Sequence, residues 1–127
     1  MSIKAKYQPV LDLGESFGVK DGYVEETEGK LRIGGVAQTQ YQKDRMWDKI
    51  KEIGGDPPFD LEADIKVEIT DYYHMHTVES GDTLGAISKQ YYGKAGAYMT
   101  IFNANTNILK DPNVIHPGQE LTIPFPG

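Results

Sequence analysis

The segment at residues 76–124 most constrains the fold, because fewer than fifty residues must build a core there. Strands are predicted at residues 76–78 and 120–123, the second with Leu121 and Ile123 directed inward. A two-stranded sheet is not stable by itself in water. We therefore expect a β-α-α-β unit in which two helices between these strands pack onto the sheet.

The first of these helices is predicted from the spacing of its apolar residues. Leu84, Ile87 and Tyr91 fall on one helical face, and Gly93 ends the pattern. Asp82 lies just before this helix and can accept hydrogen bonds from its free backbone N–H groups. We therefore expect Asp82 to act as the helix cap.

The second helix follows after a short connection. Tyr98, Ile101 and Phe102 share one of its faces and are predicted to enter the core. Three asparagines mark its polar rim and its end: Asn103, Asn105 and Asn107.

The first half of the chain predicts a separate small α+β unit, so the whole chain is expected to belong to the α+β class. Strands are expected at residues 23–27 and 30–36, and the turn between them makes a hairpin. Thr39 and Gln42 have capping-box spacing and begin an amphipathic helix, which is followed by an alternating strand at residues 63–69. The expected order is strand, strand, helix, strand. Residues 7–20 show no clear pattern, and we assign no helix or strand to them.

The helix of the first half is predicted to bury four residues on one face: Met46, Trp47, Ile50 and Ile53. We place Trp47 in this core and not in a sugar-stacking platform. Two groups of carboxylates are predicted to lie on solvated strand faces and not to form acid–base pairs or cation sites. They are Glu25, Glu26 and Glu28, and Asp60, Glu62 and Asp64.

Composition and charge exclude several classes of function. The net charge of −6 disfavours nucleic acid, since phosphate binding needs clustered cations. Without cysteine the chain has no disulfide, thiolate ligand or cysteine nucleophile, and no serine–histidine–acid triad or phosphate-binding glycine loop is found. No segment has the length of a membrane span, and residues 1–12 lack a signal peptide's apolar region, so we expect a cytoplasmic, non-catalytic binding protein.

The second half closely resembles the LysM family. The resemblance includes His-Thr-Val-Glu-Ser-Gly-Asp-Thr-Leu at residues 76–84 and Ile-His-Pro-Gly-Gln-Glu-Leu-Thr-Ile-Pro at residues 115–124, with Tyr92-Gly93 and Ile101-Phe-Asn-Ala-Asn between them. It implies a LysM β-α-α-β domain at residues 75–127 that binds glycans containing N-acetylglucosamine, such as peptidoglycan or chitin. The implied groove has Gly81, Asp82, Thr83 and Leu84 on one wall and Asn107, Ile108 and Leu109 on the other.

The first half, at residues 1–71, resembles a BON domain through Gly-Lys-Leu-Arg-Ile-Gly-Gly-Val at residues 29–36 and the helix and strand that follow. BON followed by LysM resembles a bacterial cytoplasmic potassium-binding protein family. This resemblance implies an alternative ligand, K⁺, held by backbone carbonyls with the two domains closing on the ion. Because any residue has a carbonyl, no K⁺ ligand is assigned. A third interpretation is an adaptor that binds a protein partner.

A histidine metal site is the remaining hypothesis. His74 and His76 lie two residues apart and project to the same side of a strand, so they could ligate a metal together. No third or fourth ligand is evident nearby. We therefore favour an exposed or packed role for both histidines.

Overall fold

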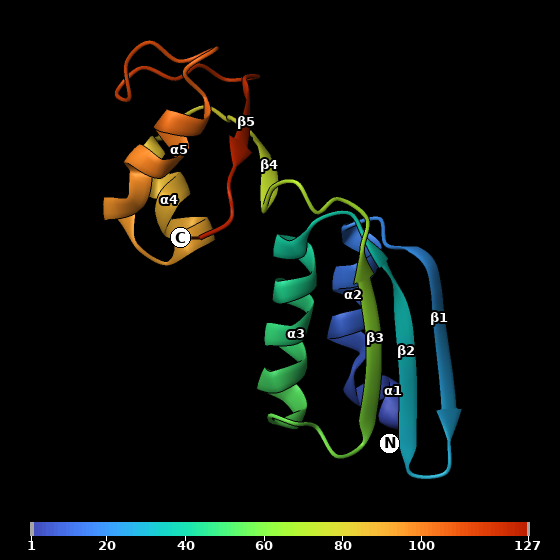
Figure 1. The fold of residues 1–127 in the computed structure, drawn as a ribbon. Helices are drawn as coiled ribbons and strands as arrows, with labels where there is room; N and C mark the ends of the chain where they lie inside the picture. The colour runs from blue at the N-terminus through green and yellow to red at the C-terminus, as the bar shows by residue number, and fades with distance from the viewer. Residues whose placement is uncertain (1, 127) are drawn as a thin grey trace. The chain divides into compact units, whose positions relative to one another are not determined.

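The computed structural model describes residues 2–126, which form two compact units divided between Thr70 and Asp71. Each unit combines helices with its own β-sheet (Figure 1). The predicted α+β class is therefore confirmed. Within residues 2–126 no helix is both long enough and apolar enough to cross a bilayer.

The first unit contains a three-stranded sheet in the order β1-β2-β3. Strands β1 (Lys20–Thr27) and β2 (Lys30–Ala37) form the predicted antiparallel hairpin. Strand β3 (Leu61–Val67) is parallel to β2, and helix α3 (Gln40–Gly54) makes the crossover that a parallel pair requires. Strand β3 ends at Val67, before the predicted residue 69.

Strand β1 is an edge strand whose residues are all exposed. Its pairing with β2 shifts register between Lys20 and Tyr23, where Asp21 takes a positive φ of 51°. Glu25 and Glu26 are exposed, as predicted, and Glu26 accepts a hydrogen bond from the Lys4 backbone N–H at 3.0 Å. The core of the unit is therefore built by the helices with β2 and β3.

Helix α3 begins after Thr39, the predicted cap, and Gln42 reaches back to the residue before that cap. The Thr39 hydroxyl accepts a hydrogen bond from the Gln42 backbone N–H at 3.4 Å. The Gln42 side chain accepts one from the backbone N–H of Gln38 at 3.0 Å. The predicted apolar face is directed to the core, with Met46 and Ile50 buried and Trp47 and Ile53 half-buried.

Two helices precede the hairpin in a stretch to which sequence analysis assigned no element, so the expected order was incomplete. They are α1 (Ile3–Lys6) and α2 (Gln8–Ser16). Helix α2 buries Val10 and Gly14, and a Cβ added to Gly14 would lie 3.1 Å from the Met46 methyl carbon. Val10, Leu13 and Phe17 do have helical spacing, but the glycine at the helix contact carries no apolar signal.

Asp60 corrects a second expectation, because it is buried and does not lie on a solvated face. Only 5% of the residue is exposed. Its carboxylate accepts hydrogen bonds from Lys6 Nζ at 2.7 Å and from the Tyr7 hydroxyl at 2.5 Å. Burial alone would raise the pKa of Asp60, but the hydrogen bonds from Lys6 and Tyr7, together with the positive charge of Lys6 and a backbone hydrogen bond, hold it below its usual value.

The second unit contains the predicted two-stranded antiparallel sheet. Strand β4 (His74–Thr77) pairs with β5 (Glu120–Ile123), and His74 lies opposite Ile123. The pairing continues past β4, because the Val78 N–H donates to the Gln119 carbonyl at 2.8 Å and the Val78 carbonyl accepts from Gly118. The first strand begins at His74, two residues before the predicted start.

Helices α4 (Leu84–Tyr92) and α5 (Tyr98–Ala104) connect the strands, with a 3₁₀ turn, η1 (Ala95–Ala97), between them. The predicted face of α4 is buried, and Gly93 ends the helix in a left-handed conformation with φ of 79°. Ile101 is the buried residue of α5, whereas Phe102 is half-buried and Tyr98 is 37% exposed. Tyr98 is therefore not a core residue.

Asn105 was predicted to lie on a polar rim, and the structure corrects this. The residue is 2% exposed. Its Nδ2 donates to the carbonyls of Ile101 at 2.7 Å and Thr122 at 2.8 Å, and its Oδ1 accepts from the Thr122 N–H at 2.9 Å. Asn105 thus joins the end of α5 to β5 in the interior.

Candidate functional site

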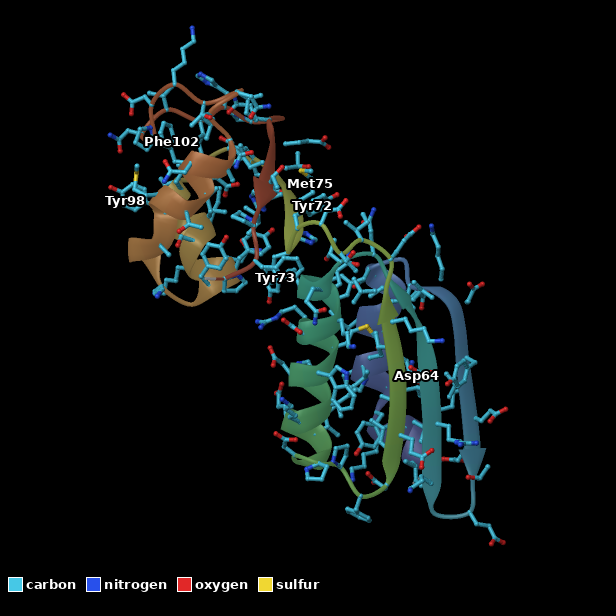
Figure 2. All side chains as sticks on the ribbon, viewed as in Figure 1. Asp64, Tyr72, Tyr73, Met75, Tyr98 and Phe102 are labelled. Atoms are coloured by element: carbon cyan, nitrogen blue, oxygen red, sulfur yellow. The ribbon has the colours of Figure 1, made fainter. Side chains whose placement is uncertain are left out.

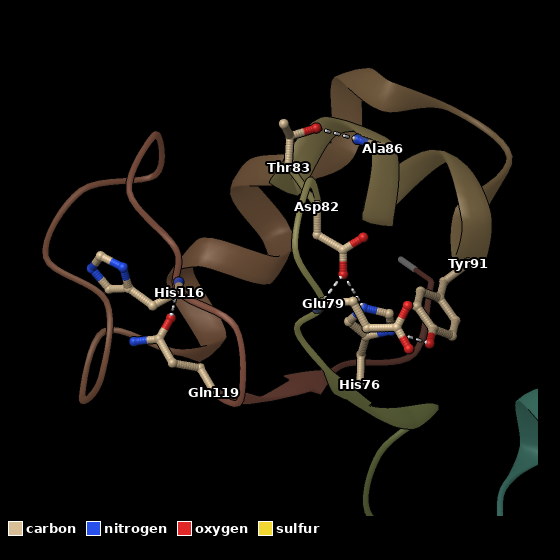
Figure 3. A network of polar contacts seen from close by, with 8 residues as sticks. All are labelled: His76, Glu79, Asp82, Thr83, Ala86, Tyr91, His116 and Gln119. Carbon is tan, nitrogen blue, oxygen red and sulfur yellow. Dashed lines mark hydrogen bonds and ion pairs between the residues drawn. The ribbon is translucent and has the colours of Figure 1, made fainter.

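The turn before α4 carries the predicted Gly-Asp-Thr-Leu motif. Gly81 has a φ of 91°, a conformation that favours glycine. Helix α4 begins at Leu84, so the preceding Thr83 is its cap, and the Thr83 hydroxyl accepts from the Ala86 N–H at 3.1 Å (Figure 3). The prediction that Asp82 caps the helix is wrong, because Asp82 lies one residue too early.

Asp82 instead holds the turn together and joins it to strand β4. Its Oδ2 accepts a hydrogen bond from the Glu79 backbone N–H at 2.8 Å and is 2.9 Å from His76 Nε2 (Figure 3). The Glu79 hydrogen bond, followed by that of His76, holds the pKa of the Asp82 carboxyl below its usual value. Asp82 is therefore a carboxylate that only accepts hydrogen bonds at neutral pH.

His76 continues this network into α4. Its Nδ1 is 2.6 Å from the hydroxyl of Tyr91, a residue that is only 7% exposed. Because ionised Asp82 can only accept, a neutral His76 carries its proton on Nε2 and accepts from Tyr91 at Nδ1. The three side chains thus form one directed chain of hydrogen bonds from Tyr91 through His76 to Asp82.

The two histidines of β4 therefore have local partners. The His74 ring lies 5.3 Å from the Tyr91 ring, and burial, with a smaller contribution from His76, lowers the pKa of His74. Among residues 2–126, no group of three or more histidine, aspartate or glutamate side chains could hold a metal ion.

A depression of about 410 Å³ lies next to the turn. One side is formed by residues 82–85 at the start of α4. The other side is formed by Tyr98 and by Pro112, Asn113 and Ile115 of the loop after α5. The lining combines backbone groups, a carboxylate and an amide with apolar and aromatic surface, which is the mixture that binds a small polar ligand with apolar faces.

The sequence-predicted wall residues divide into two groups. Asp82, Thr83 and Leu84 line the depression, and Gly81 directly precedes them in the chain. The residues predicted for the opposite wall do not line it. These three residues are Asn107 and Ile108, which are exposed, and Leu109, which is 2% exposed.

Comparison with known proteins identifies both the domain and the family. The LysM domain family matches residues 76–124. The potassium binding protein Kbp of Escherichia coli O6:H1 is 39% identical over 101 residues, which cover 80% of this chain and 67% of that protein. The chain belongs to the Kbp family. A Deinococcus radiodurans protein is 42% identical over 50 residues, 39% of this chain and 19% of that longer protein.

In this Kbp-family chain, sequence reasoning missed half of the depression. Tyr98 was assigned to the core, but it lies at the surface of α5 (Figure 2). Tyr98 has apolar neighbours along the helix, so the sequence pattern did not distinguish its exposure from that of Ile101. Pro112 and Asn113 had turn-forming character, which predicts a loop but not where the loop lies. One available signal was the length of the segment after α5, since long loops often carry binding residues.

Proposed function

We propose that this chain is a non-catalytic protein that binds K⁺. The observation that carries the proposal is the identity to a protein named potassium binding protein Kbp over 101 residues. The second unit holds only the 57 residues from 71 to 127, so this alignment extends into both units. A similarity limited to the LysM domain would support LysM functions alone.

The physical chemistry of the chain is compatible with a cation ligand. Its net charge of −6 attracts cations and repels anions at low ionic strength. K⁺ is a hard monovalent ion that is held well by several converging carbonyl oxygens in place of its hydration shell. We expect backbone carbonyls to supply these oxygens, and we assign no individual ligand. A cytoplasmic location is part of this proposal.

Selective stabilisation by K⁺ is the expected result. An ion that binds only the folded chain stabilises it by about 1.4 kcal/mol when its free concentration is about ten times Kd. The Tm should therefore rise by several degrees in KCl relative to NaCl at the same ionic strength. Differential scanning calorimetry across a series of K⁺/Na⁺ ratios measures the effect.

The constant ionic strength in this series removes general screening as a cause. Choline chloride serves as a second control, because choline is too large for a site built for K⁺. Equal Tm values in all three salts would rule out a K⁺ function for the chain.

A second candidate function is glycan recognition by the LysM domain, and the depression favours it. An N-acetylated amino sugar presents an amide, hydroxyls and apolar faces. The backbone of the turn at residues 82–85 can meet the amide, while Leu84, Ile115 and Tyr98 offer apolar and aromatic surface. Gly81 supports this wall through its turn conformation. Asn107, Ile108 and Leu109 stay a prediction from the family resemblance only.

Titration with an N-acetylglucosamine oligomer tests this candidate. We expect micromolar to millimolar affinity, roughly, because a shallow site buries little apolar surface while it orders a polar ligand. Amide signals of residues 81–85 and 112–115 should shift in NMR spectra. A glucose oligomer of equal length, which lacks the acetamido group, is the matched control and should shift them much less. Absence of any shift at millimolar oligomer would rule out this candidate.

A further inference from the structure

A second hollow lies in the first unit, between α2 and the start of the β1–β2 hairpin, and we call it the hairpin pocket. Leu11 and Glu15 of α2 line one side, and Val19, Gly22 and Val24 line the other. Its volume of about 410 Å³ is at the lower end of the range for small-molecule sites. All of its lining residues belong to the first unit, so it is separate from the depression of the LysM domain.

The inner part of the hairpin pocket is apolar and reaches the core of the unit. Its lining includes four core residues from four elements: Val10 of α2, Ile33 of β2, Met46 of α3 and Ile65 of β3. Val24 of β1 lies opposite Ile33 in the sheet but is 41% exposed. Apolar surface that is open to water beside a core gains free energy when a ligand covers it.

The pocket is open because no helix buries β1. Helices α2 and α3 lie on the same face of the sheet, whereas β1 lies at its edge and is exposed along its whole length (Figure 1). Gly22 adds no side chain to the gap, and the nearest heavy atom to a Cβ built there is 3.8 Å away. Backbone pairing with β2 holds this wall, and the close approach of Gly14 to the Met46 methyl holds α2 on α3. Full closure would therefore require movement of an element and not only of side chains.

The rim of the pocket carries a single kind of charge. Among the described residues that line the pocket, Glu15 is the one charged side chain, and it is exposed. No basic residue lines the pocket, and Glu15 forms no ion pair within residues 2–126. The net charge of −6 adds to the attraction for a positive group. The lining is therefore complementary to an apolar molecule that carries one positive charge.

We propose that the hairpin pocket binds a small amphiphilic amine. The apolar body of the ligand covers Val24 and the core residues, and its protonated amine lies beside the Glu15 carboxylate. A carboxylate of the same shape places its negative charge next to Glu15 and is disfavoured, and an uncharged alcohol is intermediate. This binding is independent of K⁺ and of glycan recognition.

Three ligands with chains of equal length test the proposal on the full chain: n-octylammonium, 1-octanol and octanoate. Affinity is measured from NMR shifts of the methyl signals of Val10, Val24 and Met46. We expect n-octylammonium to bind with a Kd of roughly millimolar order, because the ligand is small and the pocket is partly open. Octanoate should bind at least about fivefold more weakly, and 1-octanol should lie between them.

Substitutions in the first unit separate the charge from the shape of the pocket. Glu15→Gln keeps the shape and should weaken n-octylammonium about threefold while leaving 1-octanol unchanged. Asp12→Asn is the matched control, because Asp12 is an exposed carboxylate of α2 that does not line the pocket. Gly22→Leu adds a side chain where there is room and should weaken both ligands at least about fivefold.

Urea unfolding followed by Trp47 fluorescence establishes that each variant is folded under the conditions of the titration. Equal affinities of n-octylammonium and octanoate for the unchanged protein would overturn the ligand class. The site itself would be rejected if n-octylammonium shifted none of the three methyl signals, or if Gly22→Leu bound it as tightly as the unchanged protein does.

Discussion

Replacement of Asn105 by alanine is expected to lower the free energy of unfolding of the second unit by about 3 kcal/mol. The substitution removes three hydrogen bonds of 2.7 to 2.9 Å. It also leaves the Thr122 N–H without its partner and creates space around a side chain that is 2% exposed. Each buried polar group that loses its partner costs about 1–3 kcal/mol, so the losses add to a large effect.

Asn103 provides the matched control, since it is the same residue type, lies on α5 two residues before Asn105, and is exposed. Asn103→Ala should change stability by less than about 0.5 kcal/mol. Urea unfolding followed by NMR amide signals of residues 71–126 reports on the second unit alone. Equal stability of the two alanine variants would show that the Asn105 side chain does not join α5 to β5.

Asp60→Ala is the second large effect, and we expect the first unit to lose about 3 kcal/mol at pH 7. The Tyr7 hydroxyl would lose its acceptor in a fully buried position. The loss of the Lys6 ion pair contributes less, because the Lys6 side chain is 36% exposed and solvent screens its charge. Trp47 fluorescence during urea unfolding reports on this unit, since Trp47 is the single tryptophan and lies on α3.

The effect of Asp60 should also depend on pH in a defined direction. A carboxyl whose pKa is lower in the folded than in the unfolded chain stabilises the fold above the unfolded pKa. That stability is lost as the pH falls through the folded pKa. The difference between Asp60→Ala and the unchanged protein should therefore shrink below about pH 4. Asp64→Ala, at an exposed position of β3, should show neither effect.

Elements whose signals are local could be predicted from the sequence. The α4 face, its termination at Gly93 and the inward side chains of β5 all follow from residue spacing, and the structure has them. The helix cap at Thr39 is local for the same reason. The LysM motif further predicted that Asp82, Thr83 and Leu84 lie together at one wall of a depression.

Features that depend on distant partners could not be predicted in this way. Asp60 and Asn105 are polar residues whose interior positions depend on contacts with Tyr7 and Thr122, which are distant in the sequence. The opposite side of the depression is likewise formed by a loop whose position depends on packing. Periodicity and turn propensity do not contain this information.

The irregular, acidic outer strand β1 has a consequence for how copies of the chain meet. An edge strand offers unpaired backbone groups to which a strand of another molecule can add. In β1 the register shift near Asp21 interrupts any straight ladder, and Glu25 and Glu26 place like charges opposite one another in a self-paired edge. Strand β1 contributes no buried residue to the core, and its irregular, acidic edge disfavours strand pairing between molecules. This opposes fibrous aggregation at high concentration.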